Sequence, residues 1–146
     1  MKPRLAILLS ASILPIAGAG VLSTGATGMT QAAAPAPLVG KWSKTISAAT
    51  WHKHNISYEP AGKWTIAISK KGVLSFYAPG IGFLSTTTIR KSTRTSVTFG
   101  PTADGFCAGN GVYKWKVSGK TLTFSDAKDD CDARAVSWTA GSWTRE

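Results

Sequence analysis

The chain has 146 residues, with 17 basic and 7 acidic side chains and a formal net charge of +10. About 110 residues remain once an export signal is removed, which is enough for one compact domain and no more. The positive charge favours polyanions such as envelope polymers, acidic polysaccharides or anionic lipid headgroups. It does not favour nucleic acid, because the basic groups at 70–71 and 90–94 contain no aromatic residue for base stacking. Scattered basic residues are also typical of an ordinary solvated surface.

The beginning of the chain has the pattern of a cleaved signal peptide. Lys2 and Arg4 give it a positive start, and the broken apolar run 5–16 is shorter than the ~20 residues of a membrane-spanning helix. Ala-x-Ala cleavage sites lie at 17–19 and at 32–34, and no cysteine lies near them to carry a lipid. Cleavage removes two basic residues and leaves a net charge of about +8. We expect a signal peptide at 1–34, a linker at 35–38 and an exported domain at 39–146.

From Val39 onward, short runs of alternating apolar and polar residues predict β-strands separated by glycine- and proline-containing turns. The clearest hairpin is 111–124, where Tyr113 and Trp115 share one face of a strand and Leu122 and Phe124 match them after the turn. Strands are predicted at 41–46, 64–69, 73–77, 83–89, 96–99, 111–117, 121–124 and 142–145.

Two segments interrupt this pattern. Residues 48–60 are the least regular and are predicted to form a long loop or lid that has room for a short helix. Residues 125–136 are expected to form one or two helical turns, with Ser125 or Asp126 as the cap. The remaining local connections favour an all-β fold, an antiparallel up-and-down barrel of seven or eight strands, over a sandwich.

Cys107 and Cys131 are the two cysteines of the chain. In an exported protein of this size they are most simply a disulfide, since no histidine lies near either of them to suggest a metal site or a reactive thiol. Closing the intervening loop would stabilise the fold by roughly 3–4 kcal/mol on the chain-entropy model.

The Gly-Lys-Trp sequence that ends at Trp42, together with Arg145 near the end of the chain, resembles the pattern of the calycin superfamily of lipocalins and their relatives. The region from Cys107 to the C-terminus is similar to small exported bacterial lipocalin-like proteins of unassigned function. This resemblance implies a barrel in which the first-strand tryptophan closes one end. The basic residue of the last strand then packs its cation across the aromatic face.

The acidic cluster of Asp126, Asp129, Asp130 and Asp132 lacks the glycine and distal glutamate of a calcium loop. A structural role is favoured, because acidic groups suit a helix start and Asp130 stands four residues before Arg134. The chain also contains none of the common nucleophile, zinc-protease or phosphate-loop motifs, so we expect no enzyme activity.

His52 and His54 would face the same side of an extended segment and could share a metal ion or haem. They are the only histidines, and Lys53 lies between them. An exposed or loosely packed loop is therefore favoured, and we expect no metal or other cofactor.

Large apolar residues in the predicted strands either fill the barrel or line a small cavity, and filling is favoured. They are Trp42, Trp64, Ile66, Ile68, Phe76, Tyr113, Trp115, Leu122 and Phe124. The residues expected to frame a ligand at the open barrel end are Trp51, Tyr58, Trp64, Phe76, Tyr77 and Trp115.

The leading hypothesis is a secreted, monomeric binding protein without enzyme activity, whose ligand is a small apolar or amphipathic molecule. The alternative is a surface interaction module with a filled core, which binds an anionic envelope polymer or another protein through the basic groups at 70–71 and 90–94. An enclosed volume of roughly 300 Å³ or more would favour the first hypothesis.

Overall fold

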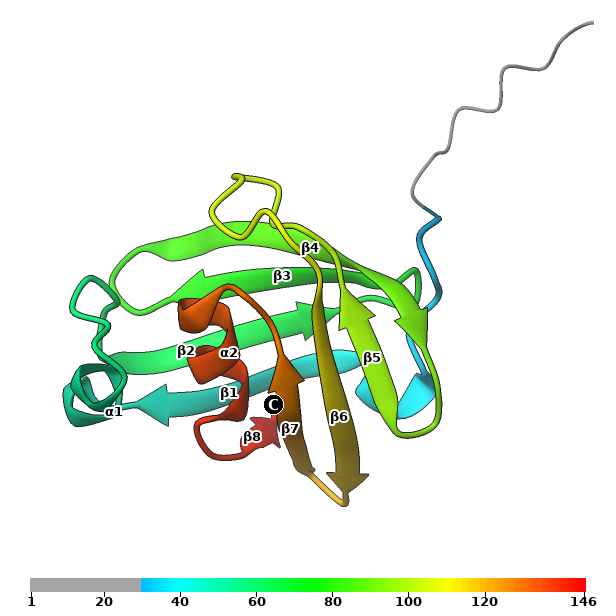
Figure 1. Ribbon diagram of the computed structural model, residues 1–146. Coiled ribbons are helices and arrows are strands. Elements are labelled where there is room, and N and C mark those ends of the chain that lie inside the picture. The colour runs from blue at the N-terminus through cyan, green and yellow to red at the C-terminus, as the bar shows by residue number, and fades with distance from the viewer. Residues whose placement is uncertain (1–29) are drawn as a thin grey trace, which may run out of the picture.

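The computed structural model describes residues 30–146, so the expected signal peptide lies largely outside the described residues. Eight antiparallel strands form one closed barrel in which each strand pairs with its neighbours in the chain and β8 returns to β1 (Figure 1). This confirms the predicted fold class. The elements are η1 (Ala36–Leu38), β1 (Gly40–Ile46), α1 (Ala48–Lys53), β2 (Gly62–Ile68), β3 (Val73–Ala78), β4 (Gly82–Ser92), β5 (Ser96–Phe99), β6 (Gly111–Ser118), β7 (Thr121–Lys128), α2 (Asp132–Thr139) and β8 (Trp143–Arg145).

The interior of the barrel is filled by aromatic side chains. Trp138 of α2 stacks on Phe99 at a centroid distance of 4.4 Å and meets Phe124 edge-on at 4.8 Å. Tyr113 and Phe76 also contact the Trp138 ring, at 5.7 and 5.4 Å. All five side chains are buried. The strands therefore enclose packed rings, and no deep ligand cup remains at this level of the barrel.

The segment 125–136 differs from its predicted helical turns. Strand β7 continues to Lys128, past a register shift in its pairing with β6, and the helix begins only at Asp132. Lys114 of β6 holds Asp126 by an ion pair of 2.7 Å, and Asp126 adopts a left-handed backbone (φ 50°). The acidic segment that begins at Asp126 was expected to start a helix, but its first part belongs to the end of β7. The N-cap residue of α2 is Cys131.

Lys44 of β1 points inward and connects the barrel to the end of α2. Its Nζ donates to the carbonyl oxygens of Trp138 and Ala140, at 3.3 and 2.9 Å, and lies 4.5 Å from the centre of the Trp143 ring. The ammonium group therefore caps the carbonyl end of the helix, where a positive charge is favourable. Burial nevertheless lowers the pKa of Lys44 to about 7, since no carboxylate accompanies it.

The barrel end next to η1 is closed by Trp42 and Arg145, as the resemblance to calycins implies. The Arg145 guanidinium carbon lies 4.1 Å from the Trp42 ring centre, and the guanidinium donates to the carbonyls of Val39 and Pro37 at 2.9 and 2.8 Å. Gly40 has a φ of 139°, and a Cβ atom there would lie 2.6 Å from Arg145 Nη1. The glycine of the motif therefore makes room for the arginine.

Residues 31–34 lie on the barrel wall as a short strap. Ala32 donates its backbone N–H to the carbonyl of Ile89 at 2.7 Å, and Ala34 donates to that of Lys70 at 3.2 Å. Gly72 accommodates the strap, because a Cβ atom on Gly72 would lie 1.9 Å from the Ala32 carbonyl oxygen. One of the two expected cleavage sites, 32–34, thus falls within a segment that contacts the folded domain.

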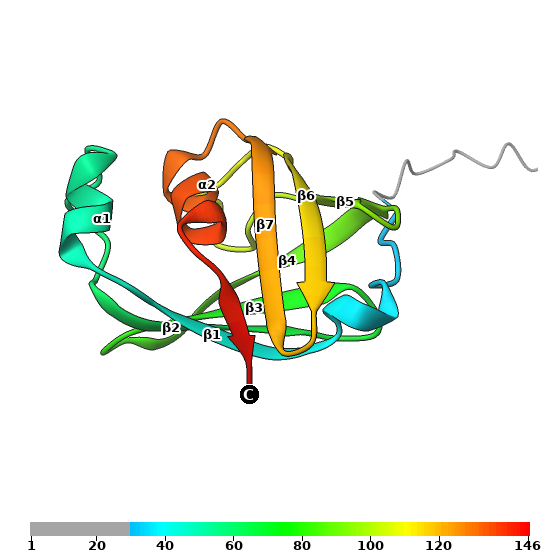
Figure 2. The ribbon, with the colours of Figure 1, turned by 90° about the horizontal axis from the view of Figure 1, so that it is seen from below.

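The opposite end of the barrel is open and carries both helices. Figure 1 shows α1 beyond the ends of β1 and β2, at the side of the molecule away from the N-terminal segment. Figure 2 shows that α1 and α2 stand over the same face of these strands, with α2 nearer to β7. The Ser47 hydroxyl caps α1 by accepting the Thr50 N–H at 3.1 Å. None of the helices within residues 30–146 is long and apolar enough to span a membrane.

Candidate functional site

The open end contains a pocket between the two helices, with a volume of about 50 Å³. Its walls come from α1, the 54–61 loop, the strands β2 to β4, the 100–110 loop and the first turns of α2. The residues that line it are Trp51, Glu59, Trp64, Phe76, Leu84, Ser85, Thr102, Asp104, Phe106, Cys107, Ala133, Arg134 and Ser137. Most of this surface is apolar, and the few polar groups are charged or hydroxyl side chains.

Two tryptophans form the wall on the side of α1. Trp51 and Trp64 meet edge-on with ring centroids 5.7 Å apart. Both indole N–H groups donate to the carbonyl oxygen of Pro60, at 3.3 and 3.0 Å. The shared acceptor ties α1, β2 and the intervening loop together, so this wall of the pocket is held in place before any ligand arrives.

Two carboxyl groups lie among the apolar walls. Glu59 is half-buried and has no ion pair or hydrogen bond within residues 30–146, and its burial raises the pKa of its carboxyl group. Burial also raises the pKa of Asp104, but hydrogen bonds from Thr102, the Phe106 N–H and Ser85 outweigh it and hold that pKa below its ordinary value. The pocket is therefore lined by two acidic side chains, although the chain as a whole is strongly basic.

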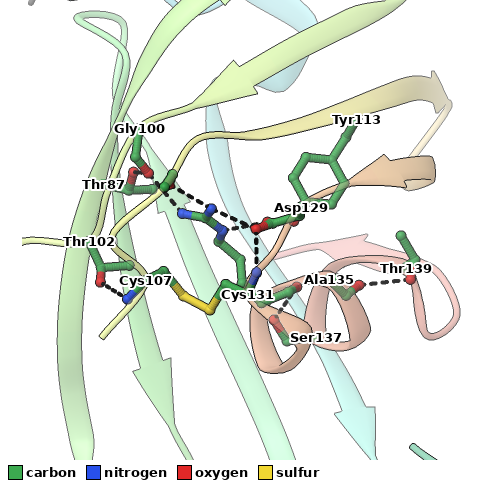
Figure 3. A network of polar contacts seen from close by, with 12 residues as sticks. Thr87, Gly100, Thr102, Cys107, Tyr113, Asp129, Cys131, Ala135, Ser137 and Thr139 are labelled. Atoms are coloured by element: carbon green, nitrogen blue, oxygen red, sulfur yellow. Dashed lines mark hydrogen bonds and ion pairs between the residues drawn. A yellow bond between two sulfur atoms is a disulfide. The ribbon is translucent and has the colours of Figure 1, made fainter. Parts of the chain in front are cut away.

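A buried polar network supports the far wall (Figure 3). Asp129 accepts from Arg134 Nε and Nη2 at 2.6 and 2.8 Å, and also accepts a short hydrogen bond from the Tyr113 hydroxyl. Arg134 further donates to the carbonyls of Gly100 and Gly109, at 2.8 and 2.9 Å. The network therefore joins β6, the 100–110 loop and α2.

Asp129, not Asp130, is the partner of Arg134, so the pairing expected from helical spacing is wrong. Asp130 is exposed, and both residues precede the helix, where the i,i+4 rule does not hold. Burial raises the pKa of Asp129, but the hydrogen bonds from Arg134, Tyr113 and the Cys131 N–H together hold it below its usual range. The predicted disulfide between Cys107 and Cys131 is confirmed and closes the same corner.

The structure brings only some of the expected ligand-binding residues to this pocket. Trp51, Trp64 and Phe76 line it. Tyr58 is exposed beside it and contacts Phe106 edge-on, with a centroid distance of 5.9 Å. Tyr77, by contrast, packs against Phe83 on the outer side of the β3–β4 hairpin, and Trp115 lies in a different groove.

Sequence reasoning did not identify Glu59, Leu84, Asp104 and Phe106 as pocket residues. The available signal was their placement: each lies in an irregular loop or close to a Gly-rich turn, where side chains reach the end of a barrel. Their convergence depends on how far each loop folds back, and no periodic pattern encodes that distance.

The histidines do not lie in an extended segment. His52 is in α1 and His54 is its C-terminal cap residue, and both are exposed. Within residues 30–146 no group of three or more histidine, cysteine, aspartate and glutamate side chains could hold a metal ion.

A second, wide groove of about 540 Å³ runs along β6 and has a basic lining. Arg94, Lys114 and Lys116 contribute its charge, and Trp115 and Val117 contribute apolar surface. Lys114 is already paired with Asp126, which reduces the charge available to a ligand. The groove lies on a different strand from the residues of the first pocket.

No family model and no curated protein matches the sequence. Among solved structures, the chain is similar to the lipoprotein YedD from Klebsiella pneumoniae subsp. pneumoniae MGH 78578. The TM-score is 0.47 and the sequence identity 14%, over 82% of this chain and 80% of that chain. A likeness this distant assigns neither ligand nor function.

Proposed function

We propose that the chain is an exported binding protein without enzyme activity, which takes one end of a small apolar or amphipathic ligand into the pocket between α1 and α2. The observation that carries this proposal is an apolar pocket with fixed aromatic walls at the open end of the barrel. The disulfide suits an oxidising compartment outside the cytoplasm.

The size of the pocket limits what is bound. A volume of about 50 Å³ is far below the roughly 300 Å³ at the lower end of complete ligand pockets. Only an end group of the ligand fits inside, and the remainder lies along the mouth. Glu59 and Asp104 line the same pocket and offer acceptors to this end group, so we expect preference for an end group that is positively charged or rich in hydrogen-bond donors.

The test is a titration of tryptophan fluorescence and melting temperature with three ligands of equal chain length: an alkyl amine, an alcohol and a carboxylate. We expect the amine to stabilise the protein most and the carboxylate least. Replacing Glu59 by Gln should narrow the difference between amine and alcohol. The control is Asp132→Asn, which changes an exposed acid outside the pocket lining. Absence of stabilisation by all three compounds would contradict the proposal.

The second candidate is binding of an anionic envelope polymer, and the filled barrel core together with the basic groove favours it. Of the groups expected from the sequence, 90–94 contributes Arg94 to this groove, whereas Lys70 and Lys71 lie at the β2–β3 turn beside the strap. Retention on an anionic polymer should fall steeply as salt rises and should weaken in Lys116→Gln. Retention that does not depend on salt would contradict it.

A further inference from the structure

Several hydrogen-bond donors that line the pocket between α1 and α2 are already used by the protein. Trp51 and Trp64 donate their indole N–H groups to the carbonyl oxygen of Pro60, at 3.3 and 3.0 Å. The Ser137 hydroxyl donates to the carbonyl of Arg134 at 2.9 Å. The two indoles therefore offer ring surface to a ligand, and their N–H groups serve to hold the pocket wall.

The positive charge at the pocket is committed as well. Among the described residues that line the pocket, Arg134 is the only basic one. Its Nε and Nη2 donate to the Asp129 carboxylate at 2.6 and 2.8 Å, and its Nη1 donates to the Gly100 carbonyl at 2.8 Å. An anionic end group would have to compete with this buried ion pair for the guanidinium, which is unfavourable.

The two acidic side chains of the lining differ in their partners. The Asp104 carboxylate accepts the Phe106 N–H at 3.1 Å, and the hydroxyl groups of Thr102 and Ser85 also donate to it. Glu59, in contrast, is half-buried and has no hydrogen bond or ion pair within residues 30–146. Burial therefore raises the pKa of the Glu59 carboxyl group. A ligand that brings a cation and hydrogen-bond donors would supply what this carboxylate lacks.

The aromatic wall suits a cation beside that carboxylate. Trp51 and Trp64 lie with 5.7 Å between their ring centroids and 61° between their planes, so two indole surfaces meet at one corner. Glu59 directly precedes Pro60, whose carbonyl oxygen accepts from both indoles. A cation is attracted to a tryptophan ring, and more strongly where water is excluded. Ring surface and an unpartnered carboxylate together favour an ammonium group, which carries its charge and its N–H donors on one atom.

We propose that the pocket is specific for a primary ammonium group at the end of an aliphatic chain, which enters nitrogen first, lies against Trp51 and Trp64 and donates to the Glu59 carboxylate. This specificity rests on the proposed function, because it concerns the same pocket. A volume of about 50 Å³ suits a compact end group of this kind. Methylation of the nitrogen removes the donors and enlarges the end group, so a quaternary ammonium binds less well. An alkyl end that entered first would leave the half-buried carboxylate beside a group that cannot donate.

The experiment is isothermal titration calorimetry of the exported protein with hexylamine, hexanol and hexyltrimethylammonium, which share one alkyl chain and differ at the end group. We expect hexylamine to bind at least about tenfold more tightly than either of the others, because it alone combines a charge with N–H donors. Equal affinity for hexanol or for hexyltrimethylammonium would overturn the specificity and leave the proposed binding function intact. Binding of none of the three would contradict both.

Glu59→Gln tests the carboxylate at nearly constant size. We expect this variant to lose about tenfold in affinity for hexylamine and little in affinity for hexanol. Its melting temperature without ligand should not fall, because Glu59 has no partner to lose within residues 30–146. The control Asp132→Asn removes an exposed acid outside the lining and should bind hexylamine as the wild type does. An unchanged preference for hexylamine in Glu59→Gln, or an equal loss in Asp132→Asn, would overturn the role of Glu59.

A pH series separates Glu59 from the other charged groups of the lining. Since burial raises the pKa of Glu59, its carboxylate is protonated first as the pH falls from about 8 to about 4, and the affinity for hexylamine should fall with it. Burial raises the pKa of Asp104 too, but its hydrogen bonds outweigh this and keep it ionised, and Arg134 stays charged in its ion pair with Asp129. Residues 52–54, at the end of α1, are exposed and outside the lining. The affinity for hexanol should not change, and a pH dependence of hexylamine binding that persists in Glu59→Gln would overturn the assignment.

Discussion

The two ends of this barrel are built on different principles. At the closed end, Arg145 covers Trp42 and donates to backbone carbonyls, and the apolar surface there is buried. At the open end, a buried ion pair and a disulfide hold the loops, and large apolar residues remain exposed.

The two ends therefore differ in their expected roles: the closed end stabilises the fold, and the open end is available for binding. The closed end joins the first and last strands through Trp42 and Arg145. The open end uses polar and covalent links to fix its backbone, which frees its apolar side chains for contact with a partner. Substitutions at the two ends should therefore have distinct consequences, and four predictions test this.

The largest effect is expected for the buried ion pair between Asp129 and Arg134, which holds the loops of the open end. Asp129→Asn leaves the Arg134 guanidinium buried without its carboxylate, and we expect a loss of about 3–5 kcal/mol in unfolding free energy. Chemical denaturation measures it. Two controls use neighbouring acids: Asp130→Asn, which is exposed, and Asp126→Asn, whose partner Lys114 is also exposed, should each cost about 1 kcal/mol or less. Equal losses in Asp129 and Asp130 variants would contradict the assignment.

This residue also shows what the sequence could and could not predict. The strand alternation, the hairpin at 111–124 and the motif at Trp42 and Arg145 are local or terminal patterns, and they predicted the barrel correctly. The partner of Arg134 depends on where β7 ends and α2 begins, and a bulge shifted that boundary. The pocket similarly depends on the lengths and paths of loops, which have no periodic signal, so Glu59 and Phe106 were missed.

At the closed end, Arg145→Ala should destabilise the protein by about 2 kcal/mol, since it removes a cation–aromatic contact and hydrogen bonds to two carbonyls. Thermal denaturation measures the change. Arg145→Lys keeps the charge but not the planar donors, and it should give an intermediate value. Ligand binding at the open end should persist in both variants below their melting temperatures. An unchanged melting temperature in Arg145→Ala would refute the role of the contact.

The buried Lys44 should make the stability of the protein depend on pH. Its pKa is about 7 in the folded protein and 10.5 in the unfolded chain, so between these values the unfolded state binds more protons. Stability should therefore rise with pH above 7, with a slope of up to about 1.4 kcal/mol per unit, and should be lowest below 7. Denaturation from pH 7 to 9.5 covers most of this window. Lys44→Met should abolish the rise; a slope that survives it would place the titrating group elsewhere.

The smallest effect is expected at the strap. A chain that begins at Pro35 lacks the hydrogen bonds from Ala32 to Ile89 and from Ala34 to Lys70, whereas one that begins at Thr30 keeps them. At about 0.5–1.5 kcal/mol for each bond, offset by the entropy of ordering the strap, we expect the shorter chain to be about 1 kcal/mol less stable. Because the strap lies away from the pocket, both chains should bind ligand equally. A difference in binding would show that the two ends are coupled. N-terminal sequencing of the exported protein would then decide which chain occurs: cleavage at 17–19 retains the strap, and cleavage at 32–34 removes it.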